Sequence, residues 1–258
     1  EADGEFMWPT SVALDSKGDL YLADEWLNRI SKFTKDGEFV SKWGVAGSGD
    51  GELNGPAGLA IDSDDNIIVV DAGNNRVQKF SLDGKYISQF GKQGSADGEF
   101  NNPWGIALDS EGHVYIADWR NDRIQKFTAD GQWEASIGSS GSGVGQLNRP
   151  NGLAVDADGD IYVADWMNNR VQVFAPDGRY ITEFQGEAVL SKWGRDKLAS
   201  NPDMIRQRSL AFASDPDYEK KLAHPCGVKI DPEGRIVIID HTRNRLQIYI
   251  KEAEPALV

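Results

Sequence analysis

Apolar and polar residues alternate with a period of two along most of the chain. "HVYIAD" (113–118) and "RIQKF" (123–127) alternate, and "QWEASIG" (132–138) follows the turn "ADG". A short apolar run, "WGIALD" (104–109), precedes them. Alternation over five or six residues, bounded by Gly and Asp, is typical of short β-strands joined by tight turns. This stretch therefore predicts four consecutive antiparallel strands.

The same four-strand pattern recurs along the chain. Each unit begins at a proline: Pro9, Pro56, Pro103, Pro150 and Pro225. The first three steps are each 47 residues long, and the last is 75. Four strands in a repeat of about 40–50 residues are the signature of a β-propeller blade. We predict an all-β fold, a single β-propeller domain over 1–258, with repeats at approximately 5–51, 52–98, 99–145, 146–186 and 224–252.

A second frame of residues marks the end of the second strand in each unit. The copies are "ADEWLNR" (23–29), "VDAGNNR" (70–76), "ADWRNDR" (117–123), "ADWMNNR" (164–170) and "IDHTRNR" (239–245). The Asp and the closing Arg are constant, and the residues between them vary. Asp accepts hydrogen bonds from loop amides, and Asn tolerates left-handed turns. We expect the Arg to tie one blade to its neighbour through a charge-assisted bond to a carboxylate.

These motifs resemble those of the NHL-repeat family. The resemblance lies in "PAGLAID", "PWGIALD" and "PNGLAVD", in the Asp–Arg frame, and in strands such as "RIQKF" and "RVQVF". It implies a propeller, commonly of six blades. The chain shows five units, and "YIKEAEPALV" gives the fifth no convincing fourth strand. We expect a sixth blade in the full protein; a ring closed by five blades is the alternative.

Residues 187–223 interrupt the period. "EAVLSKWGRDKLAS" and "NPDMIRQRSLAFAS" are rich in helix formers, and a Ser/Asp cap with Pro216 follows. We predict a helical insertion of two or three short helices. It serves as a lid or docking arm on one face, or packs against the propeller side.

Composition excludes several classes of partner. The net charge of −14 disfavours nucleic acid and anionic membranes, although Arg120, Arg149 and Arg243 leave a local basic patch open. No apolar run approaches the roughly 18–20 residues that span a bilayer, so we expect a soluble protein. The single cysteine, Cys226, reads as a small buried side chain; a thiol paired with His224 is the alternative.

The variable positions gather on one face of the predicted propeller. The loop between the second and third strands of a blade and the connection between blades emerge on the same side, which we call the loop face. Five of the eight tryptophans fall there, whereas Trp43 and Trp133 read as core and Trp193 lies in the insertion. Tryptophan offers a large rigid surface and one donor. We predict a binding site formed by Trp8, Trp26, Trp104, Trp119, Arg120, Asn151, Trp166 and His241.

This site predicts a non-enzymatic binding scaffold. A protein partner is favoured over a small-molecule ligand because no convergent polar triad is present. The alternative for the tryptophans is that they pack on neighbouring loops and plug the channel mouth. A structural subunit of a larger assembly is a further alternative, with the loop face as an oligomer contact.

An enzyme is the other alternative. Some NHL-type propellers are lyases whose histidines surround a central metal, and propeller lactonases hold calcium in the channel. Here His224 and His241 are the candidate metal ligands, and "DADGD" (156–160) is a candidate calcium loop. No histidine follows a unit proline, no catalytic residue stands out, and the "DADGD" equivalents read as solvated turns. We therefore expect no cofactor, with Ca or Zn as the alternatives.

Overall fold

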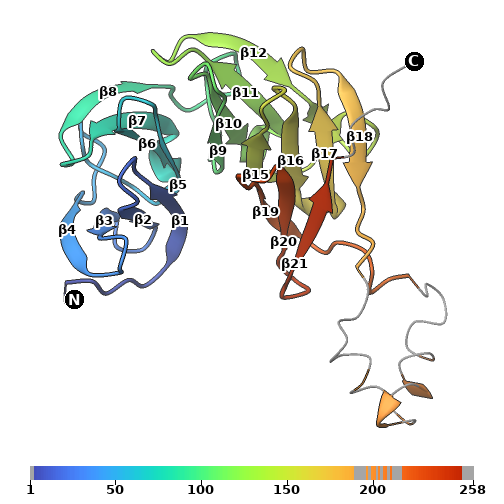
Figure 1. Ribbon diagram of the computed structural model, residues 1–258. Coiled ribbons are helices and arrows are strands. Elements are labelled where there is room, and N and C mark those ends of the chain that lie inside the picture. Colours follow the sequence, from blue (N-terminus) through green and yellow to red (C-terminus); the bar gives the residue numbers. More distant parts are fainter. Residues whose placement is uncertain are drawn as a thin grey trace, which may run out of the picture.

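The strands of the computed structural model form five antiparallel sheets arranged as an arc (Figure 1). The structure describes residues 3–188 and 217–251 and a few isolated positions between them. The first two sheets, blades 1 and 2, consist of β1 (Pro9–Leu14), β2 (Leu20–Asp24), β3 (Arg29–Phe33), β4 (Phe39–Trp43), β5 (Pro56–Ile61), β6 (Asn66–Asp71), β7 (Arg76–Ser81) and β8 (Tyr86–Phe90).

The next three sheets complete the arc. Blades 3 and 4 consist of β9 (Ile106–Leu108), β10 (Val114–Asp118), β11 (Arg123–Phe127), β12 (Trp133–Ile137), β15 (Pro150–Val155), β16 (Ile161–Asp165), β17 (Arg170–Phe174) and β18 (Tyr180–Phe184). Within the described residues blade 5 has three strands: β19 (Pro225–Ile230), β20 (Arg235–Asp240) and β21 (Arg245–Ile250). Short β13 (Ser139–Ser140) and β14 (Gln146–Leu147) pair in the connection between blades 3 and 4. The predicted β-propeller is confirmed.

Strand alternation explains how the blades pack face to face. In β10, Val114 and Ile116 pack toward blade 2, whereas Tyr115 and Ala117 pack toward blade 4. Successive side chains point to opposite faces of a sheet, so a strand between two neighbouring blades is apolar at every position. Each large apolar side chain buried in this way contributes about 1.5–3 kcal/mol.

The glycine of each "P-x-G" motif allows the innermost strands to approach one another. A Cβ atom on Gly105 would lie 2.1 Å from the carbonyl oxygen of Asn151, and one on Gly152 would lie 2.7 Å from Cα of Gly227. Real side chains do not approach so closely, so only glycine permits this spacing.

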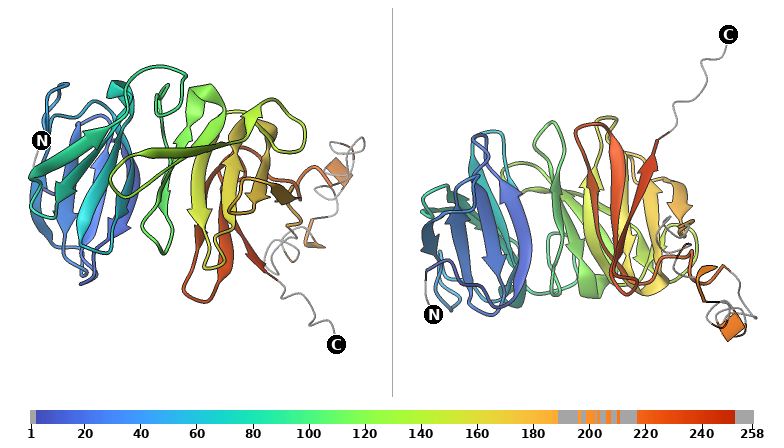
Figure 2. Two further views of the ribbon diagram at one scale, coloured as in Figure 1. Left: turned by 90° about the horizontal axis from the view of Figure 1, so that it is seen from above. Right: turned by 60° about the horizontal axis from the view of Figure 1, so that its bottom comes forward.

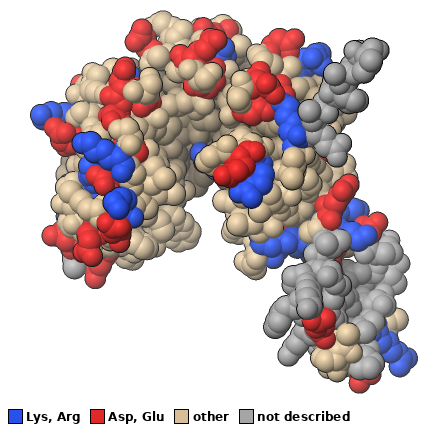
Figure 3. All heavy atoms as spheres, viewed as in Figure 1, with Lys and Arg blue, Asp and Glu red and all other residues tan. Residues whose placement is uncertain are grey.

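The arc is open between blades 1 and 5 (Figures 1 and 2), and the space-filling view keeps the opening (Figure 3). Both ends expose apolar positions that are buried between other blades. Phe6 is 53% exposed, whereas Leu53 at the same position of the next repeat is 0% exposed. At the other end Leu246 is 61% exposed, whereas its blade 4 equivalent, Val171, is 0% exposed. The alternative of five blades closing on themselves is therefore wrong for this chain.

The predicted helical insertion lies mostly outside the described residues. Where the chain is described again it packs between blades 4 and 5: the Leu222 amide donates to the Gln185 carbonyl at 2.7 Å, and the Leu222 side chain is buried in the core that these two blades share. The described residues contain no helix with the length and hydropathy of a membrane span.

Candidate binding face

Hydrogen bonds join the loop after each second strand to the connection that enters the same blade. In blades 3 and 4 these loops are short 3-10 turns, η2 (Trp119–Asn121) and η3 (Trp166–Asn168), as is η1 (Ala72–Asn74) in blade 2. The Arg120 amide donates to the Asn101 carbonyl at 3.0 Å, and the Met167 amide donates to the Asn148 carbonyl at 3.1 Å. The two kinds of segment therefore form one face, as the alternation of strands predicted.

The constant Asp of the frame organises each of these loops. Asp118 accepts the Asn101 amide at 2.8 Å and also bonds the side chains of Asn121, Arg123 and Gln125. Burial raises the pKa of Asp118, and the hydrogen bonds from Asn101, Asn121 and Arg123 oppose that rise. Asp165 in blade 4 is surrounded in the same way, and burial raises its pKa too. These carboxylates serve the fold and are not accessible to a ligand.

The Arg of the frame differs from the expectation in its partners. Its carboxylate lies in the same blade: the Arg76 Nε–Asp71 Oδ2 distance is 2.8 Å. The contact to the preceding connection uses backbone carbonyls instead, those of Ser48, Gly49 and Glu52. The bond that ties neighbouring blades is thus a hydrogen bond from a guanidinium to carbonyl oxygens.

A second set of bonds links successive blades through left-handed residues. The residue before the frame Arg has a positive φ in every blade, and in blades 1 to 4 its side chain accepts the amide before the next unit proline. These pairs lie 2.7–2.8 Å apart: Asn28 with Gly55, Asn75 with Asn102, Asp122 with Arg149, and Asn169 with His224. The expected left-handed geometry of the frame is confirmed.

Five side chains from blades 3, 4 and 5 gather on this face, and we call them the stacked cluster: Trp119, Arg120, Arg149, Trp166 and His224. The rings of Trp119 and Trp166 have centroids 6.2 Å apart, and those of Trp166 and His224 are 5.2 Å apart. The guanidinium carbon of Arg149 lies 4.5 Å from the Trp119 centroid, and that of Arg120 lies 5.7 Å from it. Such cation–π contacts are worth about 0.5–1 kcal/mol at exposed sites.

Two members of the stacked cluster occupy a backbone conformation that disfavours them. The residue before the unit proline has φ of 60° at Gly55, 54° at Asn102, 56° at Arg149 and 51° at His224. Glycine and asparagine suit this left-handed region, whereas other L-residues pay about 1–2 kcal/mol there. Blades 4 and 5 therefore carry Arg149 and His224 against local preference, and both side chains reach the tryptophans.

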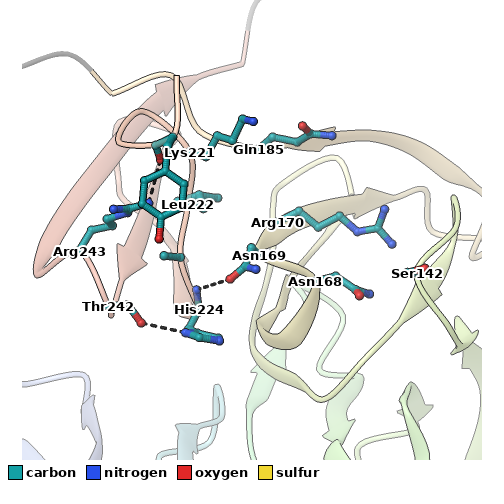
Figure 4. A pocket seen from close by; sticks show the side chains of 12 residues that line it. Ser142, Asn168, Asn169, Arg170, Gln185, Lys221, Leu222, His224, Thr242 and Arg243 are labelled. Atoms are coloured by element: carbon teal, nitrogen blue, oxygen red, sulfur yellow. Dashed lines mark hydrogen bonds between the residues drawn. The ribbon is translucent and has the colours of Figure 1, made fainter. Parts of the chain in front are cut away.

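A pocket of about 460 Å³ adjoins the stacked cluster between blades 4 and 5 (Figure 4). His224 belongs to both, since its ring stacks on Trp166 and also lines the pocket. Asn169 and Arg170 line it from blade 4, and Lys221, Thr242 and Arg243 line it from the blade 5 side. We call it the blade 4–5 pocket.

Three of the predicted site residues lie apart from the stacked cluster, in the central channel. Trp8, Trp104 and Asn151 line a cavity of about 590 Å³ together with Cys226 and the glycines of the inner strands. None of the described residues that line this channel is Asp, Glu or His. Burial raises the pKa of the Cys226 thiol, which favours the neutral form.

The remaining predicted residues are exposed. Trp26 is 66% exposed on blade 1, and His241 is exposed on blade 5. The interpretation of Trp133 as core is wrong: it is 39% exposed because β12 is the outermost strand of its blade. Trp43 is partly buried and packs against Phe80, with ring centroids 4.5 Å apart.

The candidate ligand His224 and the aspartates of the "DADGD" turn have other partners. His224 Nδ1 lies 2.9 Å from Oγ1 of Thr242, and no group of three or more His, Cys, Asp or Glu in the described residues is arranged to hold a metal ion. In the "DADGD" turn, Asp156, Asp158 and Asp160 all bond the ammonium of Lys251, at 2.7–2.8 Å.

The predicted binding set does not include Arg149 and His224. The signal was present at the residue before the unit proline. Gly55 and Asn102 indicate a left-handed position there, so an arginine and a histidine at the same position are departures that need a reason.

Comparisons with known proteins agree with the repeat. The NHL repeat model matches residues 100–127 and 147–174, and a family model described as a 6-bladed β-propeller matches residues 10–91. Over 40 residues the chain is 45% identical to the E3 ubiquitin-protein ligase TRIM71 of Rattus norvegicus. That stretch is 16% of this chain and 5% of the ligase.

Solved structures share the fold at low sequence identity. A streptogramin B lyase matches with a TM-score of 0.61 and 16% identity, covering 95% of this chain and 70% of the lyase. A catalytically inactive virginiamycin B lyase from Staphylococcus aureus with quinupristin matches with a TM-score of 0.60 and 15% identity, covering 94% and 69%. A protein of unknown function from Bacteroides caccae matches with a TM-score of 0.59 and 15% identity, covering 90% and 70%.

The matched models together span blades 1 to 4, and the strand order of each of those blades is the order that a propeller repeat requires. The chain belongs to the NHL-repeat β-propeller family.

Proposed function

We propose that this chain is a binding scaffold and that a protein partner binds its loop face at the stacked cluster. The observation that carries the proposal is the pair of left-handed positions, Arg149 and His224, whose side chains meet the tryptophans at a cost to the backbone. Strain of this kind persists where the surrounding structure over-determines it, and it concentrates at functional sites.

The physical character of the cluster suits a protein interface. Tryptophan and arginine are enriched among the residues that dominate the binding energy of interfaces, because each buries a large area and carries hydrogen-bond donors. Here Trp119 and Trp166 are already half-buried and stacked, so a partner would meet side chains that are largely ordered. Similarity to an E3 ubiquitin-protein ligase, whose name implies a protein substrate, agrees with a protein partner.

The enzyme alternative has less support. Its site would lie in the central channel, where the described lining residues supply no carboxylate or imidazole for acid–base or metal chemistry. The similarity to streptogramin and virginiamycin B lyases is a similarity of fold.

Hydrogen–deuterium exchange tests the location of the site. The probe is a peptide selected on the immobilised chain from a 12-residue random display library. We expect slower exchange in 119–122 and 166–169 when the peptide binds, because these loops carry the tryptophans. The turns at 128–132 and 175–179, on the opposite face, serve as the internal control. Protection confined to those turns or to the inner strands would refute the proposed site.

A further inference from the structure

We infer that the partner presents an acidic segment and that one of its carboxylates enters the blade 4–5 pocket. This inference rests on the proposed function, since it adds the chemistry of the partner to the same face. Three observations support it: the charge of the pocket, two nearby guanidinium donors that have no acceptor among the described residues, and the covering of the rings in the stacked cluster.

The pocket is cationic in a strongly acidic protein. The chain has a net charge of −14, yet Arg170, Lys221 and Arg243 line the pocket, and no Asp or Glu is among its described lining residues. A low-dielectric concavity lined by one sign of charge concentrates ligands of the opposite sign. The pocket therefore favours an anionic group against the overall field of the protein.

Arg243 is held in place but not fully paired. Its Nη2 donates to the Tyr218 carbonyl at 2.8 Å, and its guanidinium carbon lies 4.1 Å from the Tyr218 ring centroid. Its Nε is buried and has no acceptor among the described residues. Arg170 differs, because its nitrogens bond Asp165, Glu183 and backbone carbonyls. Arg243 is thus the guanidinium that an incoming carboxylate would meet.

Arg149 in the stacked cluster has a similar unpaired donor. Its Nη1 is buried without an acceptor among the described residues, while its guanidinium covers Trp119. A buried donor without an acceptor costs about 1–3 kcal/mol, and an arginine can satisfy a carboxylate through two parallel bonds. A peptide segment whose acidic side chains reach both Arg149 and Arg243 would supply acceptors to both guanidinium groups and so remove both energetic penalties.

A peptide fits this face better than a single-stranded nucleic acid. Nucleic acid binding without sequence preference needs open aromatic faces for the bases and a basic groove along the backbone. Here Arg149 covers Trp119, and Trp166 lies between Trp119 and His224. The net charge of −14 also repels a long polyanion, whereas one or two carboxylates need only the local arginines.

Fluorescence anisotropy with defined peptides tests the inference. The probes are labelled 12-residue peptides in which aromatic residues alternate with Glu, Lys or Gln, together with a 12-nucleotide single-stranded RNA and inorganic phosphate as a competitor. We expect only the Glu peptide to bind. A charge-assisted bond contributes about 1.5–3 kcal/mol, so Arg243→Ala should weaken this binding roughly 10- to 100-fold.

The control is Arg179→Ala, which removes an exposed arginine from the turn at 175–179 on the opposite face. It should leave the affinity within about twofold if binding depends on local contacts rather than on net charge. Equal binding of the Lys or Gln peptide, tighter binding of the RNA, or full competition by millimolar phosphate would overturn the acidic-peptide inference. Loss of binding in Trp166→Ala with no effect of Arg243→Ala would overturn it while leaving the proposed function intact. No effect of either variant would overturn both.

Discussion

The residue before each unit proline shows how one position can serve fold and function differently in different blades. Its backbone is left-handed from Gly55 to His224, and its amide bonds the preceding blade. The side chain takes no part in that bond, so it is free to vary. In blades 2 and 3 the position holds Gly55 and Asn102, which favour a left-handed backbone. In blades 4 and 5 it holds Arg149 and His224, whose side chains contact the tryptophans of the loop face.

The strain at Arg149 can be measured with two substitutions. Arg149→Ala and Arg149→Gly both lose the contact with Trp119, but only glycine is comfortable at φ of 56°. We expect the glycine variant to be more stable than the alanine variant by about 1 kcal/mol in the free energy of unfolding. Urea denaturation checks this difference, and an alanine variant of equal or greater stability would show that the position carries no strain.

The sequence allowed the scaffold residues to be predicted but only part of the site. The constant Asp and Arg indicated hydrogen-bonded loops because repeated geometry needs repeated residues. Trp119 and Trp166 were recognisable as variable positions on a loop. Their contact with Arg149 and His224 was not, because the stacking depends on side-chain directions across three blades. Trp104 and Asn151 share the face in sequence terms, yet their strands direct them into the channel.

At the level of single strands and turns, blade 4 differs from blades 1 and 2. In those two blades a lysine on the third strand pairs with an aspartate of the turn between the first two strands, and blade 4 has no lysine at that position. Lys32 bonds Asp19 at 3.0 Å in blade 1, and Lys79 bonds Asp62 at 2.8 Å in blade 2. The corresponding residue of blade 4 is Val173. Lys251, at the end of β21, instead reaches the three aspartates of the blade 4 turn and links the last strand to the neighbouring blade.

Lys251→Met should remove this link. We expect a loss of about 1 kcal/mol in the free energy of unfolding at pH 7, at the upper end for exposed ion pairs, because three carboxylates share one ammonium. Burial raises the pKa of Asp156, but the Lys251 ammonium, the Asp160 amide and the Tyr162 hydroxyl outweigh it, so the pKa lies below its usual 3.8. A lowered folded pKa means that this stability is fully present above pH 3.8 and is lost as the pH falls through the folded pKa.

Urea unfolding of both proteins between pH 7 and pH 2 measures the effect, and the difference should shrink at the acidic end. Lys85→Met is the matched control, because Lys85 pairs with Asp83 at 3.2 Å where both side chains are largely exposed. It should change the stability by less than about 0.5 kcal/mol. Equal losses in the two variants would show that Lys251 adds no specific link.

The elements themselves were predictable because their signal is local. A period of two, bounded by Gly and Asp, identified the strands, and the spacing of 47 residues identified the blades. The exposure of Trp133 was not predictable from the sequence. Its equivalents in the other blades are also apolar, and an apolar residue is found both at fully buried positions and at positions that pack on one side only. The link made by Lys251 joins residues more than 90 apart in sequence, and no local pattern encodes it.

At the scale of the whole molecule, the arc ends in two sheet faces that no other blade covers. The same sequence positions are buried inside the arc and exposed at its ends, as at Val171 and Leu246. The family model that matches blades 1 and 2 describes six blades, and the described residues of this chain form five. The sequence predicted the number of repeat units but not the gap between blades 1 and 5. Whether a ring of blades closes depends on the angle between each pair of packed blades, which no single repeat encodes.

Leu246→Ala and Val171→Ala test whether the end of the arc is uncovered in solution. The two residues occupy the same position of the repeat, but Val171 is buried and Leu246 is exposed. We therefore expect the free energy of unfolding to fall by about 2 kcal/mol in Val171→Ala and by less than about 0.5 kcal/mol in Leu246→Ala. Both are measured by urea denaturation at low micromolar concentration. A comparable loss at Leu246 would mean that the face is covered, and it would favour a subunit of a larger assembly.

The affinity of the variant Trp166→Ala shows whether the loop face of blades 3 to 5 is the binding surface. Isothermal titration calorimetry with the display-selected 12-residue peptide compares this variant with Trp133→Ala, which removes the same side chain from the outer strand of blade 3. A central tryptophan of an interface contributes about 2 kcal/mol or more, so Trp166→Ala should bind roughly 30-fold more weakly, with Trp133→Ala unchanged. Equal affinity of the two variants would mean that the loop face of blades 3 to 5 is not the binding surface.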